Sequence, residues 1–458
     1  MNSRPRSERM GTEAILPLLI KLSIPSVLGM LIQAFYNVVD SIYIGHVSTQ
    51  ALSALSLAFP IQMVLISMSV GTGIGATSLI SRTLGSGRKR RAANIAEHVV
   101  LISIVYGILI AAVGFFFTGP IVRFFTSDPQ LIELTGSYIR IIMLGSLALF
   151  VPMIFGGILR GEGNTFVPML TMILGALLNI GIDPLLIFGL GPFPELGIRG
   201  AAYATVLARL VSGGFIVVML FGRNNELLLE PRRFRFSPSL VKELYRVGFP
   251  AMAMQLLASV MLAGSNLILA AFGPLAIAVF GIFFRLQSFV LMPIFGLGQG
   301  VMPLVGYNFG NARPDRLKRT VEYGPLAAFA YAAAGFALFQ LLPGPLVRMF
   351  NTDPELVAIG TTALPRISIG FLFVGPTIIG ANLFQSVGKG MPSFMISILR
   401  TVVLLLPTMY LLGSLHGLDS LWYAFPLAEL ITMVFSVLLA LRELKSIFRH
   451  FQIKEVAG

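Results

Sequence analysis

The chain has 458 residues, of which 56% are hydrophobic and only 12% are charged. About a quarter of the residues of an ordinary soluble domain are charged, so this composition argues against a soluble protein and indicates a polytopic membrane protein. The formal net charge of +13 does not indicate a nucleic-acid partner, because the basic residues lie in short loops at regular intervals, as membrane orientation signals do.

Twelve apolar runs follow one another along the chain, each long enough to cross a bilayer as a helix of about 20 residues. They cover residues 16–44, 53–81, 93–117, 137–159, 167–189, 200–222, 248–271, 277–306, 321–342, 361–385, 393–414 and 420–441. The sequence therefore predicts an all-α, multi-pass membrane protein with twelve transmembrane helices. No A-x-A-like cleavage site follows the first run, so we interpret it as a retained helix.

Basic residues predict how these helices are oriented. Clusters precede the first run and follow the second, sixth, eighth and twelfth runs, at residues 4–9, 82–91, 223–242, 313–319 and 442–449. With twelve spans all these segments lie on one side, and positive loops stay in the cytoplasm. We therefore expect both termini to be cytoplasmic, in the plasma (inner) membrane of the cell.

The two halves of the chain repeat one another. TGPIVRFFTSDPQL at 118–131 matches PGPLVRMFNTDPEL at 343–356 without a gap, and the glycines at 71–75 match those at 296–300 with the same offset of 225. Six spans in each half give parallel repeats, which predicts two pseudo-symmetric six-helix bundles that rock about a midplane cavity.

The repeat also predicts the domain boundaries. We expect an N-terminal lobe at 1–222, a cytoplasmic linker at 223–247 and a C-terminal lobe at 248–458. Within the lobes, the glycine pairs at 71/75 and 296/300 are small-xxx-small motifs that let helices approach closely, and a hinge is the alternative interpretation.

Two acids and an amide lie deep inside apolar runs of the first half. Asn179 and Asp183 are four residues apart, so both point from one helical face. Asp40 lies in the first run. A carboxylate at the bilayer centre costs roughly 2.5–3.5 kcal/mol on insertion scales, so each is by default a functional-site hypothesis. The alternatives are a helix cap beside Pro184 for Asp183 and a structural, hydrogen-bonded acid for Asp40.

The second half lacks this set. The repeat aligns Asp40 with Ser265, Asn179 with Val403, Asp183 with Pro407 and Thr205 with Glu429. Two carboxylates, an amide and the Thr205 hydroxyl supply hard oxygen ligands for a small cation, and the same carboxylates could bind a proton instead. The sequence therefore predicts a coupling-ion site, for H⁺ or Na⁺, formed by Asp40, Asn179, Asp183 and Thr205.

Other polar residues lie inside predicted spans. Gln33, Tyr36 and Asn37 could line the same cavity near Asp40, with interhelical packing as an equal alternative. In the second half we expect Arg400 and Glu429 to form a structural ion pair, a second proton or substrate site being the alternative. The sequence names no partner for Arg209 or Arg285.

No P-loop, HExxH motif or Ser/His/Asp grouping is present, so we expect no enzyme activity and no cofactor beyond the coupling ion. Several segments then carry a family resemblance: PSVLGMLIQAFYNVVDSIYIG, LRGEGNTFVPM, LLNIGIDPLLIFG, GIRGAAYAT and GLGQGVMPLVGYNFGNARPDR. With these the chain resembles the multidrug and toxic compound extrusion (MATE) transporters over nearly its full length.

The resemblance implies two V-shaped lobes and cation-coupled export of organic, often cationic and amphipathic compounds. It also implies a cation site of the aspartate, Asn-x-x-x-Asp and threonine that stand here at Asp40, Asn179, Asp183 and Thr205, and a bend of the first helix at Pro25. We expect small drug-like substrates, a lipid bilayer and a monomer. The alternatives are a flippase for a lipid-linked precursor and a membrane-embedded enzyme.

Overall fold

The computed structural model describes residues 6–222, 225–230, 232 and 234–457, and these residues form helices and connecting loops without a strand. The first half contains α1 (Arg6–Thr12), α2 (Ile15–Val47), α3 (Thr49–Gly85), α4 (Lys89–Phe125), α5 (Pro129–Leu144), α6 (Ser146–Gly161), α7 (Phe166–Ile187) and α8 (Ile198–Phe221).

The second half begins with α9 (Pro238–Leu269), a 3-10 turn (Ala270–Phe272), α10 (Pro274–Gly310), α11 (Pro314–Leu341), α12 (Pro343–Arg348), α13 (Pro354–Ser368) and α14 (Phe371–Ser386). It continues with α15 (Gly390–Ile398), a π-helical segment (Leu399–Leu405), α16 (Leu406–His416), α17 (Leu418–Leu421) and α18 (Ala424–Ala457).

The predicted membrane spans are present. Within the described residues, 10 helices are long and apolar enough to cross a membrane, and two bent helix pairs bring the total to 12. Large apolar side chains such as Phe116, Val218 and Leu267 are exposed on these helices, and in a membrane protein such side chains face lipid. The structure is therefore an all-helical, multi-pass membrane protein.

Two of the spans, predicted as single helices, are broken. α5 and α6 meet at 52°, and α13 and α14 meet at 46°. Gly145 lies at the first break, and a Cβ there would stand 2.5 Å from the side chain of Val206 on α8. The break between α5 and α6 therefore lies where the absence of a side chain on Gly145 lets α8 pack closely. The break between α13 and α14 falls at the equivalent position of the second repeat.

The linker is shorter than predicted, because α9 already begins at Pro238, so residues 238–247 are helical. Proline favours the first turn of a helix, where its missing N–H has no partner to lose.

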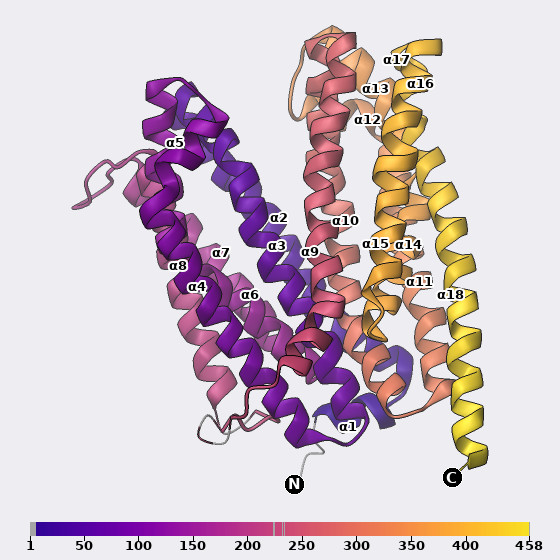
Figure 1. The fold of residues 1–458 in the computed structure, drawn as a ribbon. Helices are drawn as coiled ribbons and strands as arrows, with labels where there is room; N and C mark the ends of the chain where they lie inside the picture. The colour runs from indigo at the N-terminus through magenta and orange to yellow at the C-terminus, as the bar shows by residue number, and fades with distance from the viewer. Residues whose placement is uncertain (1–5, 223–224, 231, 233, 458) are drawn as a thin grey trace.

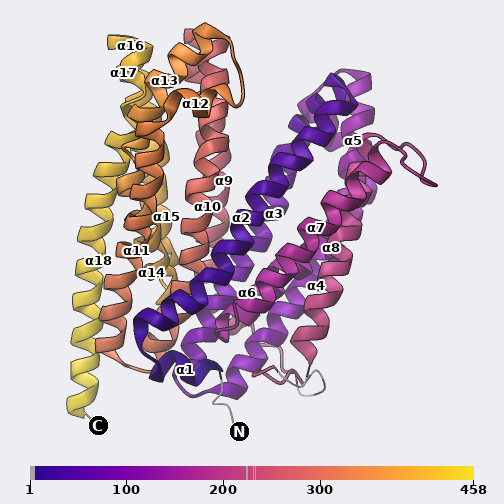
Figure 2. The same ribbon diagram turned by 180° about the vertical axis from the view of Figure 1, so that it is seen from behind.

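Figure 1 shows two bundles, α1–α8 and α9–α18, which meet at the end that holds both termini and diverge toward the opposite end; Figure 2 shows the same V from behind. We call these bundles the N-lobe and the C-lobe. The glycine pairs lie between them: Gly75 of α3 faces Leu244 of α9, and Gly296 of α10 faces Val27 of α2. The helix-packing interpretation of these glycines is confirmed.

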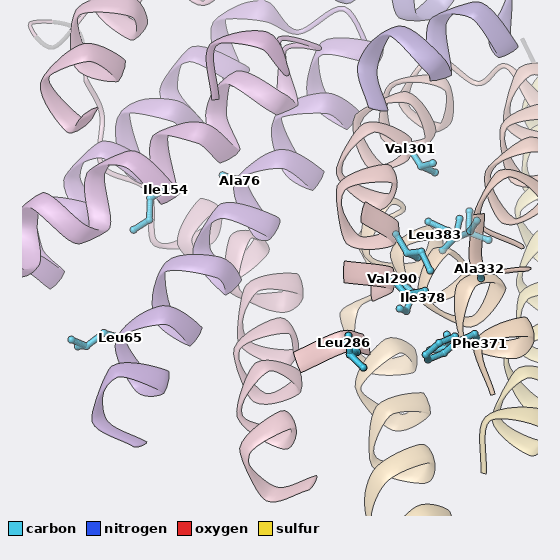
Figure 3. Packing of buried hydrophobic residues seen from close by; sticks show 14 of the residues in the cluster. Leu65, Ala76, Ile154, Leu286, Val290, Val301, Ala332, Phe371, Ile378 and Leu383 are labelled. Atoms are coloured by element: carbon cyan, nitrogen blue, oxygen red, sulfur yellow. The ribbon is translucent and has the colours of Figure 1, made fainter. Parts of the chain in front are cut away.

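One cluster of buried apolar residues includes residues of both lobes. Figure 3 shows Leu65, Ala76 and Ile154 in the N-lobe and a denser group around Phe371, Ile378 and Leu383 in the C-lobe. Phe283 of α10 stacks on Phe371 of α14, with ring centroids 6.2 Å apart. This cluster holds the helices that carry the polar residues described next.

Candidate functional site

The centre of the site is on α7, where Asn179 and Asp183 are 2% and 0% exposed. In the amide orientation that satisfies both neighbours, Asn179 Nδ2 donates to Asp183 Oδ2 at 2.8 Å, and Asn179 Oδ1 accepts from the backbone N–H of Thr205 at 3.1 Å. Buried polar groups are costly without partners. Asn179 therefore links Asp183 to α8.

The loop between α7 and α8 brings Thr205 to this position. The N–H groups of Leu196 and Gly197 donate to the carbonyls of Leu186 and Ile187 at 3.0 and 3.1 Å. Gly200 then packs directly on the Leu186 backbone, where a Cβ would clash. α8 thus runs back along α7, and the Thr205 hydroxyl lies 3.4 Å from the Asn179 amide.

The third helix of the site is α2, which carries Asp40. Its charge acts on Asp183 of α7, so the two carboxylates lie within electrostatic range of each other. Asp40 Oδ1 is buried and has no hydrogen-bond partner within the described part of the chain. The structure therefore joins Asn179, Asp183 and Thr205 by direct contacts and places Asp40 within electrostatic range of Asp183. Their role as a coupling-ion site stays a prediction.

A narrow pocket adjoins these residues. Tyr36, Asn179, Thr205 and Arg209 form its polar lining, and Gly175, Ala176 and Ala208 complete it. The Tyr36 hydroxyl interacts with Thr205 and is within electrostatic range of Asp40, Asp183 and Arg209. The sequence predicts Tyr36 as a cavity residue, and it predicts no partner for Arg209.

The other predicted cavity residues are less closely placed. Gln33 lies on α2, seven residues before Asp40, and does not line this pocket. The side chain of Asn37 lies outside the described residues. Pro25 is inside the continuous helix α2, where it frees the carbonyl of Lys21 from a helical hydrogen bond; its role as a hinge stays a prediction.

Sequence reasoning missed Tyr138 and Gln62. Tyr138 on α5 is buried, accepts a hydrogen bond of 2.7 Å from Gln62 Nε2, and interacts electrostatically with Asp40 and Asp183. The positions of Tyr138 and Gln62 in the sequence do not indicate that they lie near Asp40 or Asp183. Arg209 could have been found, because it follows Thr205 by one helical turn.

The C-lobe contains a pair of oppositely charged residues, Arg400 and Glu429, inside its spans. Arg400 Nη1 lies 3.6 Å from Glu429 Oε1, with side chains 26% and 18% exposed. Arg400 belongs to the π-helical segment Leu399–Leu405, and π-helical turns are frequent at functional sites. Glu429 Oε2 has no hydrogen-bond partner in the described structure, and Arg285 on α10 is exposed.

The site does not have the form of a histidine- or thiolate-based metal centre. Among the described residues, no group of three or more His, Cys, Asp or Glu side chains could hold a metal ion. The chemistry available is that of two neighbouring carboxylates, one with an unused oxygen, together with an amide, a hydroxyl, a phenol and a guanidinium. Such a set can bind and release a small cation or a proton.

Comparison with known proteins identifies the family. The sequence model of the MatE family matches residues 25–185 and 250–411, two segments that begin 225 residues apart. The chain is 28% identical to the multidrug export protein MepA of Staphylococcus haemolyticus, over 91% of each chain. It is 27% identical to an FAD transporter of Shewanella oneidensis, over 93% of this chain and 94% of the relative.

Solved structures agree with the sequence relatives. A MATE in complex with MaL6 superposes with a TM-score of 0.93 at 26% identity and covers 98% of this chain and 100% of its own. An outward-facing multidrug resistance MATE family transporter of the MOP superfamily has a TM-score of 0.91 at 27% identity, covering 96% of this chain and 99% of its own. These relatives are transporters and not enzymes, and the chain belongs to the MATE family.

Proposed function

We propose that this protein is a secondary active multidrug exporter, in which inward flow of H⁺ or Na⁺ drives the outward movement of organic, often cationic amphipathic compounds. The observation that carries the proposal is the junction of Asp40, Asn179, Asp183 and Thr205. It combines the fully buried carboxylate of Asp183, the carboxylate of Asp40 with one buried oxygen, and an amide that bridges two helices.

The coupling follows from electrostatics. When both carboxylates are ionised, their repulsion in a low-dielectric interior disfavours close approach of α2 and α7. A bound cation or proton removes this repulsion, so ion occupancy favours a different packing of the N-lobe. An ion can shift a conformational equilibrium only through such a difference in affinity between the two states.

The arrangement of the lobes fits alternating access. The lobes are in contact at one end and diverge at the other (Figure 1), as rocking bundles do around a midplane site. Both termini lie at the contact end, which carries the basic loops, and we assign this end to the cytoplasm and the protein to the inner membrane. We expect it to act as a monomer.

The named relatives favour export over lipid-precursor flipping. They include multidrug export proteins, among them a probable multidrug resistance protein NorM of Thermotoga maritima that is 29% identical over 86% of this chain and 85% of its own. We therefore do not retain the flippase as a candidate.

The proposal is tested by neutralising either acid. Asp40→Asn and Asp183→Asn should abolish resistance and ethidium efflux in a host that lacks its own drug exporters, at equal membrane expression. Asp315→Asn, an exposed acid in the first turn of α11, is the matched control and should behave as wild type. Full resistance in either site variant would refute the site.

A further inference from the structure

We propose that the N-terminal helix α1 (Arg6–Thr12) is a strap that holds the two lobes together at the end where they meet, and that it leaves the C-lobe when this end opens. The inference rests on the proposed function, because alternating access requires this end to open in one state. It adds the segment that controls the opening. It comes from the contacts of α1 with each lobe.

The N-lobe holds α1 through two contacts. Figures 1 and 2 show α1 at the end where the bundles meet. The backbone N–H of Ser7 donates to Glu226 Oε2 at 2.8 Å, and the Ser7 hydroxyl donates to the other oxygen of this carboxylate, which follows α8. Met10 is 0% exposed, and a Cβ on Gly163, in the turn between α6 and α7, would stand 3.2 Å from its sulfur.

The C-lobe holds α1 through two polar side chains. Asn308 of α10 is 0% exposed and donates from Nδ2 to the carbonyl of Met10 at 3.1 Å. Arg316 of α11 donates from Nη2 to the same carbonyl at 3.0 Å and to the carbonyl of Glu13 at 2.6 Å. Arg316 Nε also donates to Asn308 Oδ1 at 3.0 Å, so the two side chains bind α1 as one unit.

These bonds satisfy carbonyls that the helix itself leaves without partners. The last carbonyls of a helix have no acceptor role inside it, and α1 ends at Thr12. Glu13 is followed four residues later by Pro17, which has no N–H to donate. A cation beside a helix C-terminus is also favoured by the helix dipole. The C-lobe therefore stabilises α1 in this place, and α1 in turn favours contact between the lobes.

Close packing accompanies the hydrogen bonds. A Cβ on Gly11 would stand 2.9 Å from the ring of Tyr307 on α10 and 3.3 Å from Nδ2 of Asn311, which follows α10. The missing side chain of Gly11 thus lets α1 lie directly on the C-lobe. Its neighbour Met10 contacts the N-lobe at Gly163, so consecutive residues of α1 contact different lobes.

The second repeat makes the reciprocal contact. Ser237, directly before α9, donates its N–H to His98 Nε2 of α4 at 2.8 Å. Glu243 of α9 accepts a bond of 2.8 Å from Arg91 of α4, and Arg91 is the counterpart of Arg316 at the repeat offset of 225. The start of each half is therefore bound by the opposite lobe, with an arginine at the same repeat position.

The chain connection decides which contacts of α1 break. Only Glu13 and Ala14 separate α1 from α2, and α2 is a helix of the N-lobe. When the lobes part at this end, α1 is therefore carried with the N-lobe, and its bonds to Asn308 and Arg316 are lost. A permanent link between α1 and the C-lobe should keep this end closed.

A disulfide supplies this link, because the chain has no cysteine of its own. Gly11→Cys with Asn311→Cys places two thiols across the contact described above, within disulfide reach. In a host without its own drug exporters, complete oxidation with diamide should stop ethidium efflux, and dithiothreitol should restore it. Each single-cysteine variant should be insensitive to both reagents. Undiminished efflux by the fully oxidised double variant would overturn the inference.

A second experiment measures opening directly. Ser81 of α3 is 0% exposed, and its Oγ lies 2.1 Å from where a Cβ on Gly306 of α10 would stand. In purified Ser81→Cys protein, a maleimide reaches the thiol when the lobes part, so the labelling rate follows the open population. Adding Arg316→Gln should raise this rate severalfold. Arg319→Gln, an exposed arginine on the same helix, is the matched control. Equal rates in the two variants would contradict a strap.

The two experiments separate this inference from the proposed function. The labelling rate needs neither a dye nor a coupling ion, so it also decides if the Gly11→Cys, Asn311→Cys protein does not fold. Full efflux by Asp183→Asn contradicts the proposed coupling site and leaves the labelling result standing. Efflux that continues after complete oxidation contradicts only the strap.

Discussion

Gly85 of α3 and Tyr307 of α10 touch across the two lobes, and the Tyr307 backbone occupies the space in which a Cβ on Gly85 would stand. The repeat produces the same contact a second time, because Gly310 of α10 packs on the backbone of Arg82 of α3. Both contacts lie where α3 and α10 end, at the end of the molecule that holds the termini (Figure 1). This pair of backbone contacts closes the lobes together there.

A side chain at this seam should separate the lobes. Gly310→Leu is expected to lower the melting temperature, by an amount corresponding to about 1–3 kcal/mol or more, because the clash is with backbone that cannot rotate away. It should also weaken dye efflux by disfavouring the state in which this end is closed. Gly281→Leu on the same helix is the control, since nothing lies within 4 Å of its Cβ position. Equal melting temperatures for the two variants would contradict the close contact.

The bridging amide should matter as much as the acids. Asn179→Leu removes the donor to Asp183 and leaves a carboxylate that is 0% exposed without this partner. Losing such a partner costs about 1–3 kcal/mol. We expect lower thermal stability together with loss of ethidium efflux, measured on the same purified protein. Leu178→Ala, one residue earlier on α7, is a size control that should retain efflux.

Arg400 and Glu429 should behave as a coupled pair. Removing either charge leaves the other poorly compensated, and we expect each of Arg400→Met and Glu429→Gln to cost up to about 3 kcal/mol, the low end for buried pairs because both side chains keep some exposure. The double variant should be milder than either single change. A double-mutant cycle in thermal unfolding measures this, and strictly additive losses would show that the two do not act as a pair.

Glu162 should make stability depend on pH. This side chain follows α6, is 0% exposed, and accepts a hydrogen bond of 3.2 Å from Asn225 Nδ2. Burial, and then the nearby charge of Glu226, raises the pKa of Glu162 from 4.5 to about 8. The folded state holds the proton of Glu162 more tightly than the unfolded chain does. Protonation of Glu162 therefore stabilises the folded state fully below about pH 4.5, and this stabilisation is lost as the pH rises through 8.

The measurement is the melting temperature between pH 5 and pH 9. Wild type should become less stable toward pH 9, and Glu162→Gln, which is neutral throughout, should show a flatter profile. Glu322→Gln on α11 is the control, because this glutamate is exposed and should leave the wild-type slope unchanged. If the melting temperature of Glu162→Gln still falls with pH as steeply as that of wild type, the pH dependence comes from other groups.

Part of the architecture could be predicted from local information. Spans and orientation depend on apolar length and on basic loops, and the repeat depends on sequence identity at an offset of 225. The breaks inside the fourth and tenth spans were missed, because Gly145 looks like any other apolar-run glycine until Val206 of a distant helix packs on it. The early start of α9 was missed because its first turns are polar.

The sequence by itself determined which residues could carry the chemistry, since a carboxylate in an apolar run is costly wherever the helix lies. It therefore selected Asp40, Asn179, Asp183 and Thr205. Only the tertiary structure decided how these residues are aimed and what lies beside them. The direction of the Asn179 amide, the approach of Tyr138 and the place of Arg209 depend on the packing of α2, α5, α7 and α8, and a pattern along one chain contains no distance between helices.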